Sequence, residues 1–270
     1  MKVSKRGRRE HVSTERIEQL DRMIDSIRMK RKDSDAVKVE NEVLDTQTLM
    51  GLYRLARKGK FDALGGVINA GKEANIFLAR KGDVSIAVKI YMITTSNFNT
   101  MKKYVLGDRR FAGVKQDRQH IIFAWAQKEY RNLQSAKKAG VRVPEPYAFH
   151  RNILLMEFIG RDGLPFPQLK DVHLTREEAE HVVERLLGYI SLLYQRVHMV
   201  HGDMSEYNVL LDTDTFEPVV IDMGQSVLLD HPLAEEMLVR DIANIVRLAR
   251  EHGLFYDVDT CIQNVKEVGV

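Results

Sequence analysis

The chain has 270 residues, 44% of them hydrophobic and 29% charged, which is the composition of an ordinary soluble globular protein. This length fits one large domain or two smaller lobes, and either can bury a core without disulfides. Cys261 is the only cysteine, which excludes intrachain disulfides and cysteine-based zinc sites and favours a reducing compartment. No apolar run is long enough for a membrane span, and the basic N-terminus lacks the apolar stretch of a secretory signal. We therefore expect a cytoplasmic protein with no membrane partner.

The net charge of +3 is unevenly distributed along the chain. Residues 1–32 contain 11 Lys and Arg against 5 Asp and Glu. A second basic stretch comprises Lys102, Lys103, Arg109, Arg110, Lys115 and Arg118. Such segments can neutralise the phosphates of a polyanion, so RNA is the partner we expect. The alternative is a solvated tail and a solvated loop without a ligand.

The first part of the chain predicts two helices before any strand. Apolar residues recur at helical spacing from Ile17 to Ile27, which places one helix in a basic N-terminal extension over residues 1–44. A second helix is predicted over 46–58 and ends before Gly59, because glycine is common directly after a helix.

The pattern then becomes that of a small antiparallel sheet with one main helix. The elements expected here are strands at 67–68, 74–79 and 84–91, a hairpin turn at 81–83, a flexible basic loop over 92–119, a helix over 121–138 and a strand over 153–158.

The remainder of the chain is expected to be mostly helical. Thr175 and Glu178 form a capping box that opens a long helix ending near Met199. Short strands at 209–211 and 219–221 follow, and then helices at 233–251 and 257–267. The layout predicts an α+β fold with an N-lobe at 45–156, a hinge at 157–160 and a C-lobe at 161–270, and a cleft between the lobes is a common place for a ligand.

The strongest chemical signal lies between two of these elements. His201, Asp203 and Asn208 follow the spacing H-x-D-x-x-x-x-N, and Asp222 ends the next predicted hairpin. An aspartate on such a loop can accept the proton of a hydroxyl, while an asparagine and a second aspartate offer the oxygen ligands that Mg²⁺ prefers. A polar turn that only satisfies backbone groups is the alternative, and it leaves the coincident spacings unexplained.

Lys89 is a candidate to bind nucleotide phosphates. In a strand, Ile86, Val88 and Ile90 share one face while Ala87 and Lys89 share the other. A lysine beside a small alanine suits a nucleotide lying against the sheet, and Glu129 in the following helix is available to pair with it. A strand lysine that extends to solvent and a solvated helix glutamate are the alternatives.

A glycine-containing turn precedes the second strand. The segment from Gly66 to Glu73 matches G-x-x-x-x-G-K, but it has Glu73 where a P-loop needs Ser or Thr, and a strand rather than a helix follows. We therefore reject a Walker A site, and the G-x-G-x-x-G pattern is absent too. The backbone N–H groups of this turn and Lys72 remain candidates to cover phosphates. The sequence has no H-x-x-x-H pair, which argues against zinc.

Together these residues resemble the RIO family of atypical serine/threonine protein kinases, in particular the archaeal members of its first subfamily. The similarity covers about residues 45–265. The motifs that carry it are Ala70-Gly71-Lys72-Glu73-Ala74-Asn75, Leu155-Met156-Glu157-Phe158-Ile159-Gly160, His201-Gly202-Asp203-Met204-Ser205-Glu206-Tyr207-Asn208 and Ile221-Asp222-Met223-Gly224-Gln225.

The resemblance implies a two-lobed protein-kinase-like fold and a role for each motif residue. Asp203 would be the catalytic aspartate, and Asn208 and Asp222 the ligands of Mg²⁺, with Mn²⁺ as a possible substitute. Asp222 would also accept phosphate transiently, as is proposed for the family. The remaining implied roles concern ATP: Lys89, positioned by Glu129, holds the α- and β-phosphates; Ala70, Gly71, Lys72 and Glu73 form the phosphate loop; the backbone at Glu157 and Ile159 binds adenine; and Met156 guards the pocket.

The resemblance further implies an ATP- and Mg²⁺-dependent kinase that phosphorylates itself in the 92–119 region, or an ATPase, acting in maturation of the small ribosomal subunit. The expected partner is a precursor of that subunit or its rRNA, and the sequence does not choose a protein substrate. Two departures stand out: Asn69-Ala70 replaces the usual Ser-Thr, and no A-P-E segment follows Asp222. Like the family, the chain therefore lacks the usual peptide-docking subdomains. A small-molecule phosphotransferase of the aminoglycoside or choline kinase type and a nucleotide-binding scaffold remain as alternatives.

Overall fold

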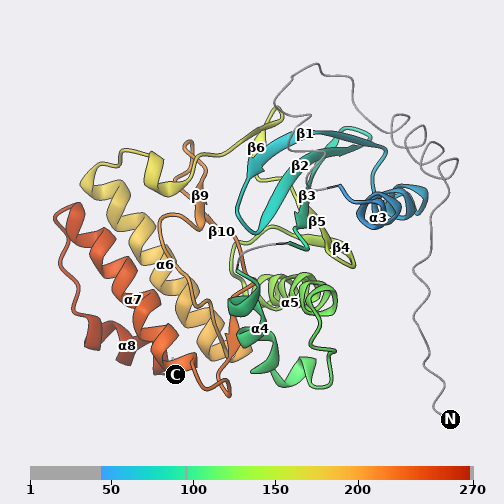
Figure 1. Ribbon diagram of the computed structural model, residues 1–270. Coiled ribbons are helices and arrows are strands. Elements are labelled where there is room, and N and C mark those ends of the chain that lie inside the picture. The colour runs from blue at the N-terminus through green and yellow to red at the C-terminus, as the bar shows by residue number, and fades with distance from the viewer. Residues whose placement is uncertain (1–43, 95–96, 268–270) are drawn as a thin grey trace, which may run out of the picture.

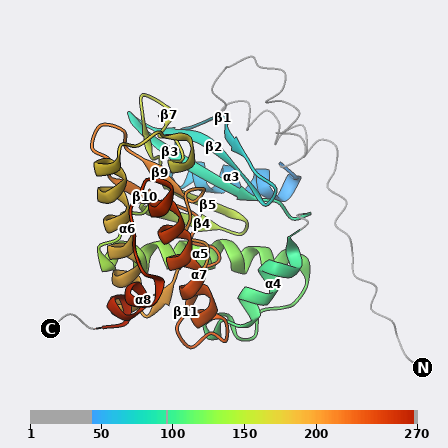
Figure 2. The same ribbon diagram turned by 90° about the vertical axis from the view of Figure 1, so that its left-hand side faces the viewer.

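The structure is a computed structural model that describes residues 44–94 and 97–267. A sheet with its flanking helices forms one part of the molecule and a cluster of helices forms the other (Figure 1). Figure 2 shows α6 and α8 on the side of the molecule away from α3. The helix predicted within 17–27 lies outside the described residues. The elements of the sheet part are α3 (Thr46–Arg57), β1 (Ala63–Ala70), β2 (Ala74–Lys81), β3 (Val84–Tyr91), α4 (Phe98–Leu106), η1 (Arg109–Phe111), α5 (Arg118–Ala139), β4 (Pro146–His150) and β5 (Ile153–Glu157).

The five strands of the sheet are antiparallel and lie in the order β1-β2-β3-β5-β4. Ile86, Val88 and Ile90 of β3 pack into the core cluster beneath α3, whereas Ala87 belongs to the core cluster on the opposite face. Lys89 shares that opposite face, as the strand period predicts. The sheet therefore buries one face under α3 and turns the other toward α5 and the helical part.

The region at 92–119, expected to be a loop, contains α4 and η1, so that expectation is wrong. Met101, Tyr104 and Val105 are buried and follow helical spacing, and α4 packs against α5. The apolar stripe is short and is interrupted by two lysines, and Asn97 makes no side-chain cap. Neither the period nor a capping signal was therefore prominent in the sequence.

The second part of the molecule is built on α6, whose predicted capping box is present. Thr175 Oγ1 accepts a hydrogen bond from the Glu178 N–H, and a Glu178 side-chain oxygen accepts one from the Thr175 N–H. Its elements are β6 (Gly160–Arg161), β7 (Leu164–Pro165), η2 (Leu169–Asp171), α6 (Arg176–Val197), β8 (Met199–Val200), β9 (Val209–Leu211), β10 (Pro218–Val220), β11 (Val227–Leu228), α7 (Ala234–Glu251) and α8 (Val258–Lys266). None of the helices in the described ranges combines the length and apolarity that a membrane crossing requires.

The long helix α5 joins the two parts. Asp117 caps its first turn by accepting from the His120 N–H at 3.1 Å, and Gly140 ends it with a φ of 95°. The helix contacts β4 and β5 of the sheet and α6 of the helical part. A single element thus touches both parts of the molecule.

Candidate active site

A cavity of about 450 Å³ lies between the sheet and the helical part. The sheet contributes its β1–β2 turn and the inner face of β3. The helical part contributes the loop after β8, Leu210 of β9 and the two residues that follow β10. Of the residues singled out in the sequence, those that line it are Gly71, Lys72, Glu73, Lys89, Met156, Glu157, Ile159, Asn208 and Asp222. Ala70, Glu129 and Asp203 do not line it, although Glu129 and Asp203 are hydrogen-bonded to residues that do.

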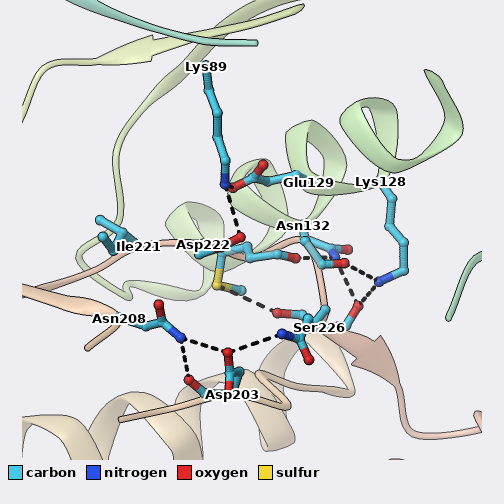
Figure 3. Close-up of polar contacts among 12 residues, drawn as sticks. Lys89, Lys128, Glu129, Asn132, Asp203, Asn208, Ile221, Asp222 and Ser226 are labelled. Carbon is cyan, nitrogen blue, oxygen red and sulfur yellow. Dashed lines mark hydrogen bonds and ion pairs between the residues drawn. The ribbon is translucent and has the colours of Figure 1, made fainter. Parts of the chain in front are cut away.

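Lys89 connects the sheet to the helical part through two carboxylates. Its Nζ lies 2.8 Å from Glu129 Oε1 and 3.0 Å from Asp222 Oδ1 (Figure 3). Burial alone would lower the pKa of Lys89, but the charges of Asp222 and Glu129 outweigh burial and raise it. The lysine is therefore cationic when it faces a ligand in the cavity.

The two carboxylates beside Lys89 differ in environment. Glu129 on α5 is 1% exposed, and burial raises its pKa to about 7. The side chain of Asp222 is 42% exposed. Burial of Asp222 opposes ionisation, but the charge of Lys89 and the hydrogen bond from its Nζ prevail and lower the pKa of Asp222. Asp222 is therefore the ionised carboxylate that faces the cavity.

The loop that carries Asp203 is tied by a neutral histidine to Ile221, the residue before Asp222. Burial lowers the pKa of His201 to about 4. The Asp203 N–H donates to His201 Nδ1 at 3.2 Å, so the ring proton resides on Nε2, which donates to the Ile221 carbonyl at 3.3 Å. Asp222 itself has a φ of 61°, in the left-handed region that a short polar side chain tolerates.

Asp203 and Asn208 contact each other directly. Asn208 Nδ2 donates to the Asp203 carbonyl and to Asp203 Oδ2, both at 2.9 Å. Gln225 Nε2 donates to the same carboxylate oxygen at 3.1 Å. Figure 3 shows the amide oxygen of Asn208 pointing away from Asp203. Burial raises the pKa of Asp203, against the opposing effect of the hydrogen bond from Asn208.

Asp241 fixes the backbone of this loop and was not identified from the sequence. Its carboxylate accepts from the Gly202 N–H at 2.7 Å and from the Met204 N–H at 2.8 Å, on either side of Asp203. Asp241 is fully buried on α7, next to Ile242. The detectable signal in the sequence was an acidic residue within the apolar stripe of a helix.

We expect Asp241→Leu to lower the free energy of unfolding by about 1–3 kcal/mol for each backbone N–H left without an acceptor. The rate of the phosphoryl transfer that the resemblance implies should fall as well, because the loop that carries Asp203 loses its anchor. Urea unfolding and a phosphorylation assay measure the two effects. Asp259→Asn, an exposed position on α8, is the control and should change neither. An unchanged unfolding curve for Asp241→Leu would contradict the anchoring role.

The β1–β2 turn closes one end of the cavity. The Gly71 N–H donates to the Ala74 carbonyl at 3.0 Å, and the Met92 N–H donates to the Glu73 carbonyl at 2.9 Å. The Glu73 side chain accepts from Asn97 Nδ2 at 2.6 Å. The turn thus contacts the segment that precedes α4.

The segment expected to act as a hinge follows β5. The Glu157 side chain pairs with Arg142 through two hydrogen bonds of 2.8 Å. The backbone N–H of Glu157 donates to the Glu145 carbonyl at 2.8 Å. The Ile159 carbonyl accepts from the Phe166 N–H at 3.1 Å. Met156, at the end of β5, lines the cavity beside them. Arg142, which the sequence did not identify, holds the hinge glutamate in place.

Asn208 and Asp222 are suited to Mg²⁺. Both line the cavity and both offer oxygen ligands. No group of three or more His, Cys, Asp and Glu residues able to hold a metal occurs within the described ranges. Mg²⁺ commonly takes one or two protein oxygens and completes its shell with phosphates and water, so this small donor set fits a metal that arrives with a nucleotide.

Comparison with known proteins identifies the family. Residues 75–261 match the RIO domain family. The RIO-type serine/threonine-protein kinase Rio1 of Haloferax volcanii is 42% identical over 246 residues, which cover 91% of this chain and 83% of the relative. The protein of the same name from Methanocaldococcus jannaschii is 42% identical and covers 82% of this chain and 74% of the relative.

The solved structures supply the fold. The Rio2 kinase of Chaetomium thermophilum, in a complex with ADP, Mg²⁺ and phosphoaspartate, matches with a TM-score of 0.59 at 18% sequence identity. The match covers 94% of this chain and 76% of that one. This likeness confirms the two-lobed kinase-like fold. The family match and the archaeal Rio1 relatives show that the chain belongs to the RIO family and is a Rio1-type protein kinase.

Proposed function

We propose that the protein transfers the γ-phosphoryl group of Mg²⁺-bound ATP to a serine or threonine hydroxyl. The observation that carries the proposal is the position of Lys89, which Glu129 holds within 3.0 Å of Asp222 beside the cavity. A lysine and an ionised carboxylate at one end of a cleft suit phosphates and their metal.

The cavity offers separate places for the two ends of ATP. Ala87 of β3 and Leu210 of β9 are among its apolar lining residues, and the hinge borders the same region. We assign the base to this end and the phosphates to the end with Lys89 and the β1–β2 turn. A bound Mg²⁺ would neutralise phosphate oxygens as charge develops on them, with Asn208 and Asp222 as its protein ligands.

Asp203 is assigned to the acceptor hydroxyl. As the hydroxyl oxygen bonds to the γ-phosphorus, the bond from phosphorus to ADP breaks, and Asp203 takes the hydroxyl proton. The pKa of Asp203, raised by burial, favours this proton transfer. Asn208 and Gln225 donate to the Asp203 carboxylate and hold its orientation.

A second activity, ATP hydrolysis through Asp222, is favoured by the exposure of that side chain to the cavity. In this route an Asp222 oxygen bonds to the γ-phosphorus as ADP leaves. Water then attacks the phosphorus, loses a proton to Asp203 and restores the carboxylate. The Rio2 complex named above contains phosphoaspartate, which supports considering this route here.

Labelling with γ-labelled ATP tests the two routes together. A label on protein that resists hydroxylamine and disappears in Asp203→Ala indicates a serine/threonine kinase. A label that hydroxylamine removes and that disappears in Asp222→Asn, together with steady phosphate release, indicates the ATPase. The absence of both label and release would contradict the proposed function.

The proposed setting is cytoplasmic maturation of the small ribosomal subunit, with its precursor particle or rRNA as partner. Support comes from the basic residues concentrated in 1–32. In the second basic stretch, Arg109 pairs with Asp230 and Arg110 pairs with Asp108, so two of its cationic side chains are already neutralised by carboxylates of the protein. Truncation of residues 1–32 should weaken binding to small-subunit rRNA and reduce its dependence on salt concentration. Equal binding by both forms at every salt concentration would contradict this role for the N-terminal residues.

A further inference from the structure

One face of α5 holds the backbone that directly follows Asp222. Trp125, Lys128 and Asn132 are at most 1% exposed and recur at spacings of three and four residues, so they lie on one side of the helix. Figure 3 shows Lys128 and Asn132 extending from this helix toward the segment that leads to Ser226. We refer to residues 223–226 as the post-Asp222 segment.

The contacts with this segment are made to its carbonyl groups. Lys128 Nζ donates to the Gly224 carbonyl at 2.8 Å and also to the Ser226 carbonyl. Asn132 Nδ2 donates to the Met223 carbonyl at 2.8 Å and to the Ser226 carbonyl at 3.0 Å. Two side chains of one helix thus bind three of the first four carbonyl groups after Asp222.

Trp125 packs against the same segment at Gly224. A Cβ added to Gly224 would lie 2.8 Å from Trp125 Nε1 and 3.0 Å from the adjoining ring carbons. The indole nitrogen is buried and has no hydrogen-bond partner among the described residues. This edge of the ring therefore holds the segment by close packing against Gly224 and not by a hydrogen bond.

Folding stability alone does not explain a lysine at this buried position. Lys128 is fully buried, and its hydrogen bonds go to neutral carbonyls. Burial lowers its pKa to about 7. An apolar side chain of similar volume commonly packs at least as favourably as a buried charge, so these directed hydrogen bonds point to a role in placing the backbone.

The same helix also controls the Asp222 side chain. Glu129, next to Lys128 in the sequence, holds Lys89, and Lys89 binds the Asp222 carboxylate. We propose that Lys128 and Asn132 are positioning residues that fix the backbone after Asp222 and thereby set its carboxylate for Mg²⁺. This inference rests on the proposed role of Asp222 as a metal ligand.

The test compares ADP binding by calorimetry with and without Mg²⁺ in the full chain. Lys128→Met and Asn132→Leu remove the donors and keep similar volume. The effect of Mg²⁺ is the ratio of the ADP dissociation constants without and with the metal. For both variants we expect this ratio to be at least tenfold smaller than in the wild type. ADP affinity without Mg²⁺ should stay within twofold, whereas the melting temperature should fall, because buried carbonyl groups lose their donors. Lys138→Met, at an exposed position on the same helix, is the control and should match the wild type.

A second pair of variants keeps the inference falsifiable if Lys128→Met does not fold. Gly224→Ala should displace the post-Asp222 segment through the clash with Trp125 and reduce the effect of Mg²⁺ in the same way. Adding Trp125→Phe makes room for the new methyl group and should restore most of that effect. If the double variant shows the same reduced effect of Mg²⁺ on ADP binding as Gly224→Ala, the inference that the position of this segment sets the metal site is contradicted.

The outcomes separate this inference from the proposed function. If Asp222→Asn abolishes the effect of Mg²⁺ while folded Lys128→Met and Asn132→Leu match the wild type, the inference is overturned and the metal site stands. If Mg²⁺ does not tighten ADP binding in the wild type, or if Asp222→Asn leaves the effect intact, the proposed metal site fails, and the inference fails with it.

Discussion

Replacement of Asp203 by asparagine is expected to lower the rate of phosphoryl transfer by about 10²–10⁴-fold, the usual contribution of a general base. Asparagine cannot take the proton of the acceptor hydroxyl. Its amide oxygen can still accept from Asn208 and Gln225, which now donate to the Asp203 carboxylate at 2.9 and 3.1 Å, so the loop should remain folded. Initial rates with γ-labelled ATP measure the effect, and ADP affinity should stay within twofold.

The matched control is Asp171→Asn in η2, an exposed aspartate outside the cavity lining. Its rate should equal that of the wild type. A fall in the rate of Asp203→Asn that is matched by an equal loss of ADP affinity would show that Asp203 acts in nucleotide binding instead of in proton transfer.

Replacement of Lys89 by methionine is expected to affect both stability and activity. Glu129 and Asp222 would lose the ammonium that lies within 3.0 Å of each. Breaking a buried ion pair by removing one partner typically costs about 3–5 kcal/mol of unfolding free energy. The rate of phosphoryl transfer should fall by about 10²–10³-fold, because a charged group directed at the phosphates is lost.

The double variant Lys89→Met/Glu129→Leu separates these two effects. Without a buried glutamate to leave unpaired, it should regain most of the unfolding free energy that Lys89→Met loses. Its activity should remain as low as that of the single variant. Urea unfolding and initial rates report the two quantities. Activity that recovers along with stability would show that Lys89 serves the fold and not the phosphates.

The features that follow regular periods were predictable from the sequence. The two-residue period of β3 predicted that Lys89 shares a face with Ala87, opposite Ile86 and Val88. The capping box at Thr175 predicted where α6 begins. The spacing of Asp203, Asn208 and Asp222 predicted their convergence, because the loop and the following hairpin return the chain to the same place.

The features that depend on tertiary contacts were not predictable in this way. The helix α4 was missed because its apolar stripe is short and becomes meaningful only when α5 covers it. The contacts of Lys128 and Asn132 were missed because their partners are backbone carbonyls, which no residue type specifies. Asp241 binds backbone N–H groups and was missed for the same reason.

We propose that Asp222 and Asn208 hold the metal that accompanies ATP in the cavity. Crystals grown with a non-hydrolysable ATP analogue and Mn²⁺, which replaces Mg²⁺ and has a strong anomalous signal, test it most directly. We expect an anomalous peak in contact with both the Asp222 carboxylate and the Asn208 amide oxygen, with the nucleotide phosphates beside Lys89. A nucleotide bound outside this cavity, or a metal that touches neither residue, would contradict the claim.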